Sequence, residues 1–199
     1  LEYSVKKEGL TIYDPCCGGG YLLTVLGLLN PKTIENMIAS DISKEAISLA
    51  KNNLSLLTVE GLFKRKQQIK GMITNFNKQS HKEALKSVEV FLKIIENRRI
   101  TPRIHCFTAD VLDEKSLANS NFKTDILITD VPYGNLVSWS DGKDNAINKL
   151  LNNVFPVLHS STIVAISTDK NQKINNERFL RHEKFKQGKR VIYILQLKE

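Results

Sequence analysis

The sequence predicts a single α/β domain over residues 1–199, built on an open and mostly parallel sheet with an antiparallel hairpin at its C-terminal end. Two observations predict this class. Short apolar runs rich in β-formers alternate with longer stretches of helical periodicity, which is typical of a parallel sheet covered by helices. The chain has 199 residues, of which 41% are hydrophobic and 25% charged, so it can bury one full core. This composition excludes a disordered tail and a small disulfide scaffold.

The alternation gives a position for each element. Strands are expected at residues 10–13, 37–40, 104–108, 125–129, 162–167 and 191–197, and helices at 21–29, 44–57, 80–97 and 145–158. Ser43, followed by Glu45, is a plausible N-cap for the second helix. Residues 178–197 favour two antiparallel strands joined by a turn at Gln187-Gly188.

The connection between the second and third strands is too long for one crossover helix and indicates a helical insertion at residues 58–103. Residues 64–103 hold eleven basic and three acidic residues, which accounts for the whole net charge of +8. The basic residues are Lys64, Arg65, Lys66, Lys70, Lys78, Lys82, Lys86, Lys93, Arg98, Arg99 and Arg103, and the acidic ones are Glu83, Glu89 and Glu96. A solvated helix face is one interpretation. Because the rest of the chain is neutral, the favoured interpretation is a surface for nucleic acid, with an acidic membrane surface as second candidate.

Several features bear on location and metal binding. No run of about 18 uncharged apolar residues exists, so the chain is expected to be cytoplasmic and not to enter a membrane. Leu1 is not Met and strand-like sequence begins almost at once, so an N-terminal segment is expected to be missing. Three cysteines without C-x-x-C spacing and four scattered histidines indicate neither disulfides nor a metal site.

The strongest local signal is a strand that runs into a glycine loop, with Asp14 at its end and Gly18, Gly19 and Gly20 before the first helix. Glycines let the backbone turn tightly and approach a ligand, with helix N-terminal amides directed at it. The dinucleotide fingerprint fails because Leu23 stands at its third glycine, and no Gly-Lys-Ser or Gly-Lys-Thr follows to make a phosphate loop. The acid at the strand end suits a ligand with an ammonium group better than a pyrophosphate.

Three further strands are each expected to end in an acid, namely Asp41, Asp110 and Asp130. Because ligands of open α/β sheets bind at the carboxyl ends of the strands, all four carboxylates should lie along one edge. Asp41 or Asp110 taken alone is better explained as a helix cap or turn former. The occurrence of four acids at four strand ends favours a shared site.

These motifs resemble a known family. The blocks Asp14-Pro15-Cys16-Cys17-Gly18-Gly19-Gly20 and Asp130-Val131-Pro132-Tyr133-Gly134 are similar to those of the class I S-adenosylmethionine-dependent methyltransferases. Within that class, the likeness to the avilamycin-resistance 23S ribosomal RNA guanine methyltransferases runs in order through nearly the whole chain. The resemblance implies a Rossmann-like seven-stranded sheet, S-adenosyl-L-methionine as cofactor, large-subunit ribosomal RNA as partner and a link to antibiotic resistance.

The resemblance also assigns residues to the cofactor. It implies that Asp14, Cys16 and the backbone of Gly18, Gly19 and Gly20 hold the methionine end. Asp41, next to Ile42, would accept hydrogen bonds from the ribose hydroxyls. Asp110 would accept from the adenine amino group, with a backbone contact from Val111 beside it.

The second block is implied to face the target base. Asp130, also placed among the cofactor-binding residues, would act catalytically with Pro132 and Tyr133: the acid polarises or accepts the proton of a guanine ring nitrogen, and Tyr133 stacks on the base. Enzymes directed at exocyclic amines commonly have Pro-Pro after the acid, but Val131 replaces the first proline here. The sequence therefore favours a ring nitrogen over the exocyclic amine.

Other functions remain open at this point. The fold could methylate DNA, transfer RNA or a protein amine, or it could be an RNA-binding module without catalysis. A nicotinamide oxidoreductase is disfavoured by the absent third glycine.

Overall fold

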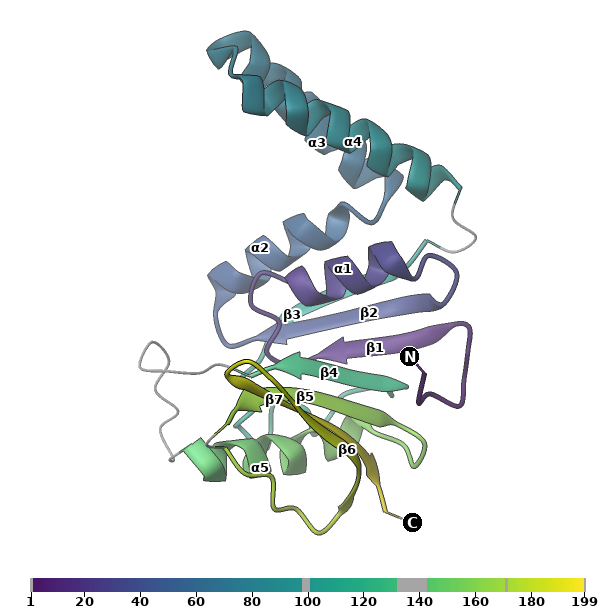
Figure 1. The fold of residues 1–199 in the computed structure, drawn as a ribbon, viewed down its shortest axis with the longest axis vertical. Coiled ribbons are helices and arrows are strands. Elements are labelled where there is room, and N and C mark those ends of the chain that lie inside the picture. The colour runs from purple at the N-terminus through teal and green to yellow at the C-terminus, as the bar shows by residue number, and fades with distance from the viewer. Residues whose placement is uncertain (1, 98–100, 132–142, 171, 199) are drawn as a thin grey trace.

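The computed structural model describes residues 2–97, 101–131, 143–170 and 172–198 around one seven-stranded sheet (Figure 1). The strands are β1 (Leu10–Asp14), β2 (Ile34–Asp41), β3 (Arg103–Thr108), β4 (Ile126–Asp130), β5 (Ile163–Asp169), β6 (Phe179–Gln187) and β7 (Arg190–Leu197). Their spatial order is β3-β2-β1-β4-β5-β7-β6. Strands β1 to β5 run parallel, and β7 pairs antiparallel with β5 and β6. The predicted fold class is confirmed.

Helices cover both faces of this sheet. They are α1 (Tyr21–Leu29), α2 (Lys44–Ser55), α3 (Val59–Phe76), α4 (Gln79–Glu96), α5 (Lys143–Asn153) and a 3-10 turn at Phe155–Val157. Adjacent residues of a strand point to opposite faces, so Ile12 packs in the cluster under α1 and α2, whereas Tyr13 packs in the cluster against α5. None of the described helices combines the length and apolarity needed to cross a membrane.

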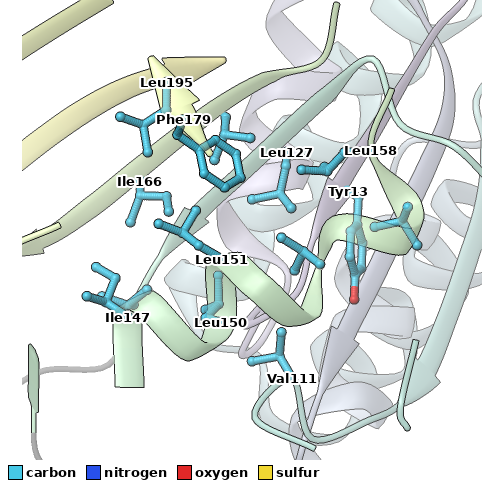
Figure 2. Packing of buried hydrophobic residues seen from close by; sticks show 14 of the residues in the cluster. Tyr13, Val111, Leu127, Ile147, Leu150, Leu151, Leu158, Ile166, Phe179 and Leu195 are labelled. Atoms are coloured by element: carbon cyan, nitrogen blue, oxygen red, sulfur yellow. The ribbon is translucent and has the colours of Figure 1, made fainter. Parts of the chain in front are cut away.

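The larger core cluster lies between the sheet and α5. Figure 2 shows Leu150 and Leu151 of α5 packed near Leu127 of β4, with Phe179 from the hairpin closing the same cluster. The Tyr13 hydroxyl in this packing shares a 2.7 Å hydrogen bond with Ser40 Oγ of β2. This core fixes β1, β2 and β4 against each other at the point where the site is built.

The ends of α1 and the start of α2 agree with the sequence prediction, whereas the end of α5 does not. The first helix spans residues 21–29 as predicted, and Ser43 caps α2 by accepting a hydrogen bond from Ala46 N at 3.1 Å. The predicted helix at 145–158 is wrong at its C-terminal end, because α5 stops at Asn153. Pro156 has no N–H for a helical hydrogen bond and disfavours helical geometry in the residue before it, so only a 3-10 turn follows.

Between α2 and β3 the chain forms a pair of long helices, α3 and α4, that extends away from the sheet (Figure 1). We call it the helical arm. One helix was expected in this segment, at residues 80–97, and it corresponds to α4. Helix α3 was not predicted from the sequence. The arm has its own small core, formed by Leu62, Ile69, Val88, Leu92 and Ile95. Leu28 of α1 packs both against this core and against the cluster under α1 and α2. The arm is therefore attached to the body through apolar contacts at its base.

Two glycines of α3 provide a matched test of this attachment. A Cβ on Gly61 would lie 1.9 Å from the backbone oxygen of Ser55 at the end of α2, whereas a Cβ on Gly71 would have no described residue within 4 Å. Gly61→Ala should destabilise the protein by about 1–3 kcal/mol, because α3 must move off α2. Gly71→Ala should instead stabilise it by about 0.5–1 kcal/mol through helix propensity. Urea unfolding of both variants measures the difference, and equal stabilisation by the two would contradict the packing described here.

Candidate active site

Acidic side chains gather where neighbouring parallel strands end, at what we call the carboxyl edge: Asp14, Asp41, Asp110 and Asp130. Asp14 ends β1 and pairs with the residue of β2 that lies two positions before Asp41. Thr108, the last residue of β3, pairs with Asp41, so Asp110 lies just beyond that strand. Asp130 ends β4, which pairs with the other side of β1. The structure brings all four predicted acids to the same edge of the sheet.

The glycine loop after β1 takes a conformation that needs glycine. Gly18 has φ +50° and Gly20 has φ +71°. A Cβ at Gly20 would lie 3.1 Å from Cβ of Ala50, so the loop is closely packed against α2, whereas a Cβ at Gly18 would meet no described residue within 4 Å. Asn53 of α2 holds the loop from behind, donating from Nδ2 to the Gly19 carbonyl at 2.8 Å. The loop is thus fixed on its helix side and open at Gly18.

Asp41 joins the glycine loop to the start of α2. Its Oδ2 accepts a hydrogen bond from Gly18 N at 2.9 Å, and its Oδ1 accepts one from Ser43 N at 3.0 Å. Each carboxylate oxygen has two lone pairs, so both can still accept from a ligand. The neighbouring Ile42 side chain is 67% exposed, which leaves an apolar surface beside the carboxylate.

Asp14 is the buried member of the set, with 2% of its surface exposed. Burial raises the pKa of its carboxyl group to about 7, and the negative charge of Asp41 adds to this rise. The Thr129 hydroxyl and the Cys16 amide, which donates to Asp14 Oδ1 at 3.1 Å, act in the opposite direction. Near neutral pH the carboxyl group is therefore partly protonated, and a cation beside it would favour the ionised form.

The thiols of the two cysteines in the loop are not activated as nucleophiles. Burial raises the pKa of the Cys16 thiol well above its ordinary value, and that of the Cys17 thiol is raised for the same reason. Both thiols are therefore protonated and weakly nucleophilic at neutral pH. Within the described ranges, no three His, Cys, Asp or Glu side chains form a group that could hold a metal ion.

Asp110 lies farther beyond its strand than the sequence prediction placed it. Asp110 was expected to close the third strand, but β3 ends at Thr108, and Asp110 makes a turn in which its Oδ1 accepts from Leu112 N at 2.9 Å. The Val111 side chain is buried in the core (Figure 2), and its carbonyl accepts from Asn153 Nδ2 at 2.9 Å. Asp110 itself is half-buried at the carboxyl edge.

Asp130 is half-exposed and forms an ion pair with Arg190, the first residue of β7. Val131 is buried next to it. Beside this pair lies a pocket of about 350 Å³, lined by Leu22, Ile128, Thr129, Asp130, Ala165, Ser167, Gln187, Arg190 and Ile192. The predicted residues Pro132 and Tyr133 lie outside the described residues. We call residues 130–134 the acceptor block. Its described part is a carboxylate at the rim of a small pocket, followed by the buried Val131.

Three residues of this site were not predicted from the sequence: Asn53, Thr129 and Arg190. Asn53 follows Ala50 by three positions in a predicted helix, so its place on the packed face could have been noticed. Thr129 adjoins Asp130 but reads as an ordinary strand residue. Arg190 is separated from Asp130 by most of the C-terminal third of the chain, and local spacing contains no signal for this contact.

Comparisons with known proteins agree with this geometry. The family described as rRNA methyltransferase AviRa matches residues 1–190. A 23S rRNA (guanine(2535)-N(1))-methyltransferase from Streptomyces viridochromogenes is 34% identical over 169 residues, which cover 83% of this chain and 67% of the relative. A solved structure of rRNA methyltransferase AviRa from the same organism has a TM-score of 0.84 at 31% identity, covering 98% of this chain and 80% of that chain.

More distant structures share the fold alone. A ribosomal protein L11 methylase from Lactobacillus delbrueckii subsp. bulgaricus has a TM-score of 0.58 at 16% identity. The match covers 100% of this chain and 74% of the methylase chain. The extent of the family match and the identity to the Streptomyces relative are what decide membership. The chain belongs to the AviRa family of rRNA methyltransferases.

Proposed function

We propose that this chain transfers the methyl group of S-adenosylmethionine to N1 of a guanine in 23S ribosomal RNA. The observation that carries the proposal is the carboxyl edge, where an open glycine loop faces the acids of adjacent strands. Family membership supports the reaction class, and the name of the Streptomyces relative specifies guanine N1 for that protein. N1 is a ring nitrogen. The sequence also favours a ring nitrogen, because Val131 replaces the first proline that is common in enzymes directed at exocyclic amines.

The residues of the carboxyl edge fit the proposed donor. S-Adenosylmethionine supplies an electrophilic methyl group on a positively charged sulfur. Asp14 and the backbone of the glycine loop, including Cys16, would hold its methionine end, since a buried carboxyl group near its pKa ionises beside an ammonium group. Asp41 would accept from the ribose hydroxyls with Ile42 beside it, and Asp110 with Val111 would contact the adenine.

The acceptor side relies on Asp130. Neutral guanine carries a proton on N1. As the new N1–C bond forms, the S–C bond of the donor would break to release S-adenosylhomocysteine, and the N1 proton would pass to the Asp130 carboxylate and then to water. A carboxylate at the rim of the pocket accepts a hydrogen bond from N1–H and so orients the nitrogen and raises its electron density. We further propose that Tyr133 stacks on the base and that Pro132 shapes the loop between them.

The helical arm supplies the proposed RNA-binding surface. The exposed basic residues of the arm are Lys64, Arg65 and Lys70 on α3, Lys78 at the N-cap of α4, and Lys82, Lys86 and Lys93 on α4. Lys66 is different, because it pairs with Glu89 across the two helices at 3.2 Å. Basic side chains that contact phosphates release counterions, so RNA affinity should depend on this exposed set and on salt. The carboxyl edge would thus bind the cofactor and the target guanine, while the positive arm would bind other parts of the RNA.

The reaction itself is tested with purified protein, S-adenosylmethionine and 23S rRNA. We expect 1-methylguanine in nuclease digests by mass spectrometry and a reverse-transcription stop, because a methyl group on N1 blocks Watson–Crick pairing. Asp130→Ala should lose methyl transfer but keep RNA binding. Preferential labelling of DNA, transfer RNA or protein would contradict the proposed substrate. RNA binding by the wild type without any methyl transfer would instead indicate a noncatalytic module.

Neutralising the arm should weaken RNA binding only. The triple variant Lys64→Gln, Lys70→Gln, Lys86→Gln is expected to bind 23S rRNA fragments roughly tenfold more weakly at 0.1 M salt, with a shallower salt dependence. The matched control neutralises exposed lysines of the body, Lys32, Lys115 and Lys198. Filter binding across a salt series measures both, and calorimetry should give an unchanged affinity for S-adenosylmethionine. Equal loss in the two triple variants would show that the arm has no special role.

A further inference from the structure

Arg190 is anchored at the carboxyl edge by acceptors of Ser167, Val131 and Asp130. Its Nε donates to Ser167 Oγ at 3.0 Å, its Nη2 donates to the Val131 carbonyl at 3.3 Å, and the guanidinium pairs with Asp130. The side chain is only 17% exposed, whereas that of Asp130 is 55% exposed. A guanidinium gives several hydrogen bonds in a fixed planar arrangement, so these contacts fix the orientation of the group it holds.

The topology of the hairpin explains how Arg190 reaches this place. Strand β6 runs in the same direction as β5 and ends near the carboxyl edge. The turn at residues 188 and 189 then reverses the chain, so β7 begins at that edge. Arg190 therefore enters β7 opposite Asp169, two residues beyond Ser167 along β5. Ser167 in turn pairs with Asp130 on β4. The side chain crosses β5 and contacts the end of β4.

The pairing of Arg190 with Asp130 indicates a functional contact. Removing a guanidinium from water costs free energy unless the charge is paired and hydrogen-bonded. Here the pairing carboxylate belongs to the half-exposed acid at the rim of the pocket, and the second acceptor is the carbonyl of the residue that follows it. A contact that served stability alone would not need an acid that also faces the pocket.

We propose that Arg190 is a positioning residue that holds Asp130 for the methyl-transfer step. This inference rests on the proposed function. The guanidinium favours the ionised carboxylate and fixes its orientation, while the carboxylate keeps lone pairs to accept from N1–H of guanine. Asp130 then acts as a fixed hydrogen-bond acceptor, and its alignment depends on the C-terminal hairpin.

The test compares Arg190→Gln and Arg190→Lys with the wild type and with Arg181→Gln, an exposed arginine on the same hairpin. Arg190→Gln should lower kcat by about ten- to a hundredfold, as expected when a reacting group is misplaced, with KM for S-adenosylmethionine within about twofold. The acid limb of the pH profile of kcat should move to higher pH, because the cation that favours the ionised carboxylate is gone. Arg190→Lys should recover part of the rate, and Arg181→Gln should match the wild type.

A second variant guards against simple loss of folding. Ser167→Ala removes the Nε acceptor but keeps the charge, so it should lower kcat less than Arg190→Gln does. Thermal unfolding of each variant gives the folded fraction. An unchanged kcat per folded Arg190→Gln molecule, or a loss of rate without any shift of the pH profile, would overturn the positioning role. A wild type that transfers no methyl group would instead contradict the proposed function itself, and this inference with it.

Discussion

Burial of the Asp14 carboxyl group, at the end of a strand flanked by β2 and β4, is the constraint on which the carboxyl edge depends. Its pKa of about 7 means that the folded chain keeps a proton that the unfolded chain releases near pH 4. Between these two values the folded state loses stability as pH rises, since ionising a buried carboxyl group is unfavourable. A cationic ligand bound beside Asp14 would offset the free-energy cost of ionising this buried carboxyl group, so the site is suited to such a ligand.

The acids of the edge have a local role as well as the proposed one. Asp14, Asp41 and Asp110 each accept a hydrogen bond from the amide two residues further along the chain. These bonds turn the backbone out of the sheet directly after the strands. The sequence analysis set turn forming against ligand binding for Asp41 and Asp110, but the geometry makes the two compatible, because a carboxylate accepts several hydrogen bonds at once.

Local patterns in the sequence predicted the elements that depend on neighbours along the chain. The strands and α1 follow from apolar runs and from the glycine loop. Helix α3 escaped because its fully buried apolar residues, Leu62 and Ile69, are far apart among polar and basic ones, and it is stabilised by packing against α4. The Asp130–Arg190 pair was not predictable, because it depends on the order in which β5 and β7 pair. The acids at the strand ends were predictable because parallel strands bring their carboxyl ends to one edge.

If the carboxyl edge binds a cation through Asp14, the affinity for that cation must depend on pH. The pH dependence of S-adenosylmethionine binding therefore tests the proposed site most directly. Calorimetric titration with S-adenosylmethionine at pH 7.5 and pH 6 should give binding roughly five- to tenfold weaker at the lower pH, because Asp14 must first lose its proton. Asp14→Asn should bind more weakly and lose this pH dependence. Equal affinity at both pH values in the wild type, matched by Asp14→Asn, would contradict the account.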